Sequence, residues 1–235
     1  MAKPLNMTLA TAQRPQTAHQ RLAQAQAALG LSPTAKQQDL LLEFLEQLLR
    51  WNKTYNLTAI RDPEQALVQH VFDSLAVIAP IQRLTKPVAS NRATLLDVGS
   101  GAGLPGIVCA IMLPDVPVSC IDAVEKKTTF IKQMIGVLAL HNLSTSHVRV
   151  ESLAPSESTV VISRAFASLR DFANLAGAHV AQAGHLVAMK AKVSSSEITE
   201  LETNTRWRVD RFEPLTVPEL QAERCLVWMR REGNQ

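Results

Sequence analysis

An acidic residue followed by closely spaced glycines is the feature of this sequence with the most direct chemical meaning. Asp97 lies in the apolar run 95–98, and glycines follow at positions 99, 101, 103 and 106. Glycine has no Cβ and adopts positive φ at little cost, so such a turn bends sharply and approaches a ligand closely. Pro105 suits the first turn of a helix that follows. The segment predicts a loop that binds a nucleotide-containing cofactor.

Two cofactors compete for this loop. The spacing Gly101-x-Gly103-x-x-Gly106 matches the fingerprint of NAD-binding folds. A carboxylate two residues before the first glycine would repel the pyrophosphate of NAD. S-adenosylmethionine has no phosphate and carries a positive sulfonium and an ammonium group, which suit an acidic neighbour. Asp97 therefore favours S-adenosylmethionine, with NAD as the alternative.

A second acidic residue supports a nucleoside site with either cofactor. Asp122 ends the β-prone segment 116–121, about 20 positions after the glycine turn. A carboxylate there lies at the tip of the second parallel strand and can accept hydrogen bonds from ribose hydroxyls. An ordinary turn residue at a strand end would look the same. Its coincidence with the glycine loop favours the cofactor role.

Strands and helices alternate through the second half of the chain. This alternation predicts a mostly parallel sheet covered on both faces. The last two strands leave no room for a helical crossover, so they form an antiparallel hairpin at the sheet edge. The predicted class is α/β, with the mostly parallel seven-stranded sheet and antiparallel edge hairpin of the S-adenosylmethionine-dependent methyltransferase (Rossmann-like) fold. The expected strands are 93–98, 116–121, 146–150, 159–163, 184–190, 206–213 and 224–230, and the expected helices are 105–113, 125–140, 168–181 and 194–203.

A helical segment precedes this alternating region. Helices are expected at 17–29, from Ser32-Pro33 onward, and at 62–79 with Asp62 as N-cap. We divide the chain into a flexible tail at 1–16, a small helical N-terminal subdomain at 17–80, a linker at 81–92 and the methyltransferase domain at 93–232.

Composition excludes several classes of protein. The chain has 46% hydrophobic and 19% charged residues, and no apolar run approaches the ~20 residues of a membrane span. The N-terminus lacks the features of a secretory signal, so a cytoplasmic protein is expected. Cys109, Cys120 and Cys225 are widely spaced, as buried reduced thiols are, and no metal site is predicted. The net charge of +3 steers a polyanion weakly, so local basic patches matter more.

Four motifs in order resemble one family, the small-subunit rRNA guanine-N7 methyltransferases, also called glucose-inhibited division protein B. The resemblance covers about residues 20 to 231 and is far more specific than a glycine loop. It implies methyl transfer from S-adenosylmethionine to N7 of one guanine in a 16S rRNA loop near the decoding centre. The motifs are Trp51-Asn52-Lys53-x-Tyr55-Asn56-Leu57-Thr58, His70-x-x-Asp73-Ser74, the loop from Asp97 to Ile107, and Ser163-Arg164-Ala165-Phe166-Ala167.

The resemblance carries cofactor contacts onto Gly99, Leu104, Val150, Glu151 and Arg164. The glycine loop itself adds Gly101, and ribose geometry adds Asp122. One departure stands at the end of the fifth strand, where the family commonly has Lys-Gly and this chain has Lys190-Ala191. Alanine resists positive φ. The direction of the Lys190 side chain therefore depends on whether the turn needs positive φ at Ala191.

The chemistry implied needs positioning more than proton transfer. Guanine N7 has an in-plane lone pair and no proton, so it attacks the methyl group directly without a general base. Segment 163–166 also lacks the Asn-Pro-Pro-aromatic motif of exocyclic amine methyltransferases. We expect catalysis by proximity, with Arg164 bridging the cofactor and substrate sites and Lys190 directed at the substrate pocket. Phe166 could stack on the base or simply pack.

Other polar residues have weaker interpretations. His70 and Asp73 lie three apart on a predicted helix and could form a hydrogen-bonded pair, most simply a structural one. Lys53 and Arg61 are candidates for RNA phosphate contacts, as is Lys190. A further basic strand could bind RNA on one face or serve as a charged edge strand. It contains Arg206, Arg208 and Arg211.

The expected partner is 16S rRNA or the small ribosomal subunit, bound by a monomer without a membrane role. Two alternatives remain open from the sequence. One is an NAD-linked oxidoreductase. The other is a non-catalytic RNA-binding ribosome-assembly factor that keeps the fold.

Overall fold

The computed structural model describes residues 16–85 and 93–233. The predicted tail, apart from residue 16, and residues 86–92 of the predicted linker lie outside the described residues. The division into tail, subdomain, linker and methyltransferase domain therefore stays a prediction.

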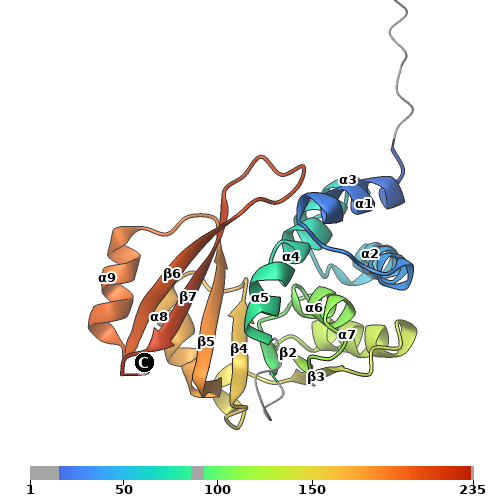
Figure 1. The fold of residues 1–235 in the computed structure, drawn as a ribbon. Coiled ribbons are helices and arrows are strands. Elements are labelled where there is room, and N and C mark those ends of the chain that lie inside the picture. Colours follow the sequence, from blue (N-terminus) through green and yellow to red (C-terminus); the bar gives the residue numbers. More distant parts are fainter. Residues whose placement is uncertain (1–15, 86–92, 234–235) are drawn as a thin grey trace, which may run out of the picture.

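The described strands form one sheet in the order β3-β2-β1-β4-β5-β7-β6 (Figure 1). The first five are parallel, and β7 runs antiparallel to both β5 and β6, which confirms the predicted edge hairpin. The chain order reverses between β1 and β4, so the carboxyl ends of these strands border a crevice where α/β proteins bind ligands. The strands are β1 (Leu95–Val98), β2 (Val118–Asp122), β3 (Leu143–His147), β4 (Ser158–Ser163), β5 (Val180–Lys190), β6 (Trp207–Leu215) and β7 (Arg224–Arg231).

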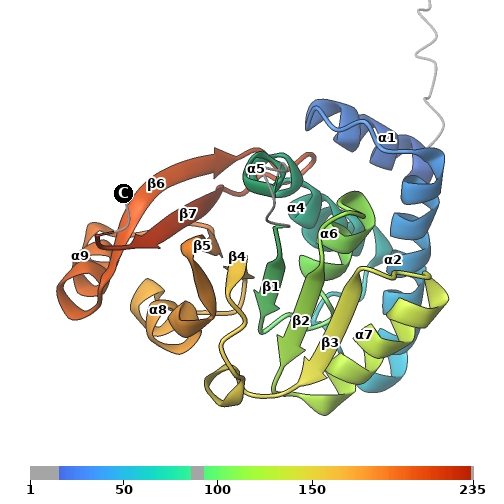
Figure 2. The same cartoon turned by 60° about the horizontal axis from the view of Figure 1, so that its bottom comes forward.

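Side chains alternate between two cores along each parallel strand, because successive residues point to opposite faces. On β1, Leu95 belongs to the larger core and Leu96 to the smaller one. Figure 2 shows α8 and α9 on one side of the sheet and α5, α6 and α7 on the other. These helices are α5 (Ile78–Thr85), α6 (Gly106–Met112), α7 (Glu125–Val137), α8 (Leu169–Ala176) and α9 (Ser195–Asn204).

The N-terminal helices complete the larger core. Helix α1 (Ala18–Ala28) and α2 (Ala35–Tyr55) each begin with a capping box, at Thr17 and Thr34. Leu41, Phe44 and Leu48 on α2 are fully buried in the same core as β1 and β2. No helix in the described ranges is long and apolar enough to cross a membrane.

The third predicted helix, 62–79, is not one continuous α-helix. Asp62 is the N-cap as predicted, but α3 (Pro63–Ala66) passes into a π-helical turn (Leu67–Phe72) and then α4 (Asp73–Leu75). A separate helix, α5 (Ile78–Thr85), begins inside the predicted third helix and continues into the segment expected as a linker from residue 81. Pro80 lies in its first turn, where a missing N–H costs no intrahelical hydrogen bond. Pro80 therefore belongs to the first turn of α5 and does not mark the end of a helix.

Two other boundaries were wrong. The third strand was expected at 146–150, but β3 covers Leu143–His147. It lies at the sheet edge and is mostly polar and exposed, so its sequence gave little hydrophobic signal. The helix expected at 168–181 ends at Ala176, and β5 begins at Val180 after one 3₁₀ turn.

Gly106 gives a direct test of how closely α6 packs on the sheet. A Cβ there would overlap Cys120 Sγ and lie 2.8 Å from Asp97 Oδ2. We expect Gly106→Ala to destabilise the protein by about 2 kcal/mol through overpacking, which lowers Tm by several degrees. Gly136→Ala is the matched control, because Gly136 lies in α7 with no neighbour within 4 Å of its added Cβ. Thermal unfolding should show this control unchanged or slightly stabilised. Equal melting of the two variants would contradict the packing described.

Candidate functional site

The glycine loop after β1 has the backbone that the sequence predicts. Gly99, Gly101 and Gly103 have φ of 67°, 59° and 82°. A Cβ on Gly99 would lie 2.9 Å from Ala165 Cβ, whereas one on Gly101 would enter open space. Positive φ is the requirement at Gly101, and both φ and close approach require glycine at Gly99.

The end of β2 holds this loop in place. Asp122 Oδ2 accepts a hydrogen bond from the Gly101 amide at 2.9 Å, and Oδ1 accepts one from the Val124 amide at 2.9 Å. The amides of Gly99 and Ser100 donate to the Ile121 carbonyl at 2.9 and 3.0 Å. A carboxylate has about four lone-pair sites, so Asp122 keeps capacity for ribose hydroxyls.

Asp97 does not have the role expected from the sequence. It is fully buried, and its Oδ2 accepts a hydrogen bond from the Gly106 amide at 2.8 Å, at the start of α6. Its Oδ1 finds no hydrogen-bond partner in the described part of the chain. Burial raises the pKa of Asp97 to about 7, because a low dielectric disfavours the carboxylate. Asp97 therefore supports the loop from beneath, and the argument that it faces the cofactor was wrong.

A cavity of about 270 Å³ opens beside the loop at the carboxyl ends of β1, β2 and β4. Of the predicted cofactor residues, Gly99, Asp122, Val150 and Glu151 line it. Gly101 and Leu104 shape the loop without lining the cavity, and Leu104 is buried in the core. Arg164 does not line the cavity either, although the next residue, Ala165, does. The full lining is Val98, Gly99, Ile121, Asp122, Ala123, Val148, Arg149, Val150, Glu151, Ala165, Phe166 and Leu175.

Several lining residues were not among the predicted cofactor contacts. Val148 and Arg149 follow β3 directly, so the correct end of that strand would have indicated them. Phe166 lines the cavity and also stacks on Phe172, with ring centroids 4.9 Å apart, so packing and lining coexist. Leu175 lies on α8, and nothing in the sequence around it indicated that it would line the cavity.

Arg164 lies just after β4 and is held by a buried carboxylate. Its Nη1 donates to Asp73 Oδ2 and to the Gln69 carbonyl, both at 3.3 Å. Arg224 Nε donates to the other oxygen of Asp73 at 3.0 Å. Asp73 is only 3% exposed, and both arginines are partly exposed, so the carboxylate is paired from two sides. This network joins α4, the loop after β4 and the start of β7.

The predicted pair of His70 with Asp73 does not form. His70 Nε2 lies 3.0 Å from Thr58 Oγ1, and Asp73 faces the two arginines. The cause is the π-helical turn, whose wider turn changes the angle between residues three apart. Burial, helped by the nearby Arg164 guanidinium, lowers the pKa of His70 to about 4. His70 is therefore a neutral structural residue.

Lys190 lies outside the cavity lining. Its Nζ donates to the Ala167 carbonyl at 2.6 Å and pairs with Glu197 Oε1 at 2.9 Å. The same Glu197 oxygen accepts the Leu169 amide at 3.0 Å, so the lysine anchors the segment that follows Arg164. Ala191 is not among the described residues with positive φ. The departure from Lys-Gly therefore places no strain on this turn.

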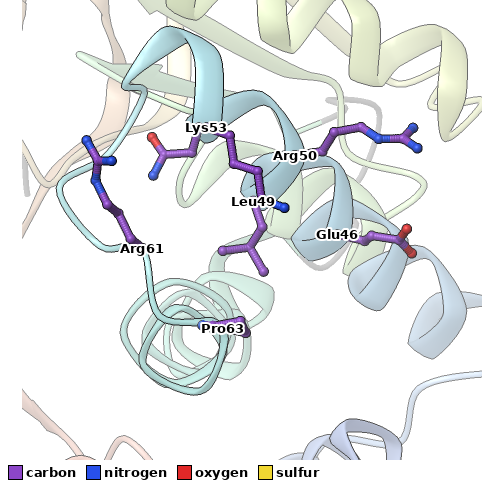
Figure 3. Close-up of a pocket in the computed structure, with 7 residues that line it drawn as sticks. Glu46, Leu49, Arg50, Lys53, Arg61 and Pro63 are labelled. Atoms are coloured by element: carbon purple, nitrogen blue, oxygen red, sulfur yellow. The ribbon is translucent and has the colours of Figure 1, made fainter.

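The predicted RNA-binding residues separate into two groups. Lys53 and Arg61 line a second cavity between α2 and the loop before α3 (Figure 3). Arg206 lies just before β6 and Arg208 at its start, level with the amino end of β5, and so at the opposite end of the sheet from the cofactor cavity. A bulge between Val209 and Arg211 places Arg211 on the Arg208 face.

The arginines of β6 are also engaged within the chain. Arg208 pairs with Glu232 at 2.7 Å and Arg211 with Asp210 at 3.0 Å. Arg211 also stacks over the Trp228 ring at 4.1 Å. These contacts favour the interpretation as a charged edge strand.

Comparison with known proteins decides the family. A family model described as rRNA small subunit methyltransferase G matches residues 37–227. The ribosomal RNA small subunit methyltransferase G of Bordetella pertussis is 59% identical over 217 residues, which cover 92% of this chain and 94% of that protein. The chain belongs to this family. The protein of the same name from Methylibium petroleiphilum is 50% identical over 214 residues, covering 91% of this chain and 95% of that protein.

Solved structures agree on the architecture of this family member. A SAM-dependent methyltransferase from Aquifex aeolicus has a TM-score of 0.52 at 16% identity, covering 72% of this chain and 98% of that one. The ribosomal protein L11 methylase of Lactobacillus delbrueckii also has a TM-score of 0.52, at 12% identity, covering 68% of this chain and 78% of that one. At these identities the likeness shows the fold alone. Together with family membership, it confirms the predicted fold class, a methyltransferase and S-adenosylmethionine as its cofactor. The NAD-linked alternative is set aside.

The low pKa of His70 predicts a pH dependence of stability. His70 stays neutral in the folded protein down to about pH 4, while in the unfolded chain it becomes charged below about 6.5. Between these values the unfolded state binds more protons, so a contribution of at most about 3 kcal/mol is present above pH 6.5 and is lost as pH falls towards 4. His70→Gln should reduce the fall in Tm between pH 7 and pH 4.5. His141→Gln, at an exposed position, is the control. An unchanged pH profile in His70→Gln would contradict a buried neutral histidine.

Proposed function

We propose that the protein transfers the methyl group of S-adenosylmethionine to N7 of one guanine in the decoding-region loop of 16S rRNA. The cavity beside Gly99 and Asp122, next to the anchored Arg164, carries this proposal in a chain of the methyltransferase G family. The substrate is 16S rRNA, alone or within the small ribosomal subunit, and the enzyme acts as a cytoplasmic monomer.

The lining of the cavity fits the cofactor. Asp122 and Glu151 offer acceptors for hydroxyl and amino groups, and Val150 with Phe166 offers apolar surface for a ring. The Cβ position of Gly101 faces open space, so the loop leaves room beside it. We assign Gly99, Asp122, Val150 and Glu151 to direct contact, and Gly101 and Leu104 to the shape of the loop.

The residues around the cavity position the reactants. Bound S-adenosylmethionine supplies an activated methyl group, and guanine N7 accepts it without losing a proton. Arg164 keeps 30% of its side chain exposed while Asp73 holds it, so its guanidinium can still donate to guanine O6 or a phosphate. Lys190 orders the segment between Arg164 and α8 through Ala167 and Glu197. Holding donor and acceptor in line can supply several kcal/mol of the barrier.

The reaction can be tested with methyl-labelled S-adenosylmethionine and small ribosomal subunits from a strain that lacks the enzyme. We expect one labelled 7-methylguanosine in 16S rRNA by nucleoside analysis. Protein-free 16S rRNA in parallel shows which form is the substrate. Cofactor binding without transfer to either form would contradict the proposal and favour the non-catalytic assembly factor.

Arg164 provides a sharper test of the site. Arg164→Ala should slow methyl transfer by about 10- to 100-fold, the usual value of a charge-assisted hydrogen bond, and should weaken cofactor binding. Arg164→Lys keeps the charge but loses the bidentate hydrogen-bonding geometry of the guanidinium group, so it should recover only part of the rate. Arg83→Ala is the control, since Arg83 is 55% exposed and pairs with Glu213 on β6. Full transfer and unchanged cofactor affinity in Arg164→Ala would exclude a bridging role.

A further inference from the structure

A second cavity, of about 420 Å³, lies on the N-terminal helices. It is formed by one face of α2 and by the segment leading into α3, and Figure 3 shows Arg61 and Lys53 on opposite sides of it. Its lining includes Glu46, Leu49, Arg50, Lys53, Arg61 and Pro63. We propose that this cavity binds one nucleotide of the substrate RNA, outside the target guanine, with the base over Leu49 and Pro63 and the phosphate between Lys53 and Arg61. The proposal rests on the proposed function.

The charges favour a polyanion. Three lining residues are basic and one is acidic. Arg50 and Lys53 form no hydrogen bond or ion pair with the part of the chain that the structure describes. Arg61 donates only to the neutral Asn56 side chain, at 2.8 Å. On β6, by contrast, Arg208 and Arg211 are already paired with carboxylates. Exposed cations without a carboxylate partner are those free to neutralise phosphates.

The wall of the cavity is formed in advance. Asn52 is 3% exposed, and its Nδ2 donates to the Ile60 carbonyl at 3.0 Å. Its Oδ1 accepts the Thr58 amide at 2.9 Å, so the loop that carries Arg61 is fixed to α2. An apolar floor with cations at the rim fits a flat base joined to a phosphate, as in single-stranded RNA. An acidic peptide would use the cations but would leave the apolar floor without a ring.

The cavity is connected to the methylation site through a short loop. Thr58 Oγ1 lies 3.0 Å from His70 Nε2, and the neighbouring Gln69 carbonyl accepts a hydrogen bond from Arg164. On the other side, Lys126 Nζ at the start of α7 donates to the Tyr55 carbonyl at 2.8 Å. Helix α7 begins just after Asp122, which lines the cofactor cavity. RNA bound in this second cavity would therefore lie beside the elements that hold Arg164.

The test is RNA affinity as a function of salt, measured on the full chain with 16S rRNA. Lys53→Ala/Arg61→Ala should weaken binding at least about tenfold and lower the slope of log K against log salt by about 0.7, since the two side chains share one phosphate and each lost phosphate contact in single-stranded RNA contributes about 0.7. The control is Lys36→Ala/Lys132→Ala, which removes two exposed positive charges elsewhere. Lys36 is on the same helix, about 25 Å from Lys53 along its axis.

Three further readouts decide between explanations. Lys53→Ala alone should weaken binding and lower the slope by part of this amount, which excludes an indirect effect through the Arg61–Asn56 contact. Cofactor affinity should stay unchanged in the double variant, so a failure of the proposed function would appear separately, as absent methyl transfer by the unaltered protein. Equal losses in the control pair would overturn the proposal. Unchanged rRNA affinity together with slower methylation of intact subunits would also overturn it, in favour of a ribosomal protein in the cavity.

Discussion

The attachment of the glycine loop to the end of β2 is the constraint on which the site depends. Three glycines with positive φ would not hold one shape alone, because glycine loses the most conformational freedom on folding. Asp122 fixes the loop by accepting the Gly101 amide, and the Ile121 carbonyl accepts two more amides. From the opposite side, Asp97 accepts the Gly106 amide at the start of α6. Two carboxylates on neighbouring strands thus hold both ends of the turn that borders the cavity.

A second network brings the N-terminal helices to the same place. Asp73 joins Arg164, just after β4, to Arg224 at the start of β7. The π-helical turn before Asp73 directs His70 toward Thr58 and leaves the carboxylate free for the arginines. A buried carboxylate between two guanidinium groups is costly to break, because removing one partner leaves charge unpaired. The helices before the sheet are therefore part of the site and share its core.

Local patterns in the sequence predicted the features that depend on nearest neighbours. The glycine turn, the mostly parallel sheet implied by alternation and the antiparallel hairpin all follow from short-range periodicity and loop length. The partners of Asp73 could not be predicted in this way, because Arg164 and Arg224 lie 91 and 151 residues away in the chain. The role of Asp97 was predicted wrongly because the argument used its charge and not the direction of its side chain. Asp97 lies on the same strand face as Leu95, beneath α6. At β3, Val148 and Val150 resembled strand residues, yet they follow the strand and line the cavity.

The most direct test of the account is a crystal structure of the protein with S-adenosylhomocysteine, the product of methyl transfer. The account predicts density for the nucleoside in the cavity between Gly99, Asp122 and Val150, with a ribose hydroxyl on Asp122 and the Gly101 amide still bound to the same carboxylate. Glu151 and Phe166 should contact the ligand, and Asp97 should stay buried beneath α6. A ligand bound outside this cavity, or an Asp122 turned away from it, would contradict the account.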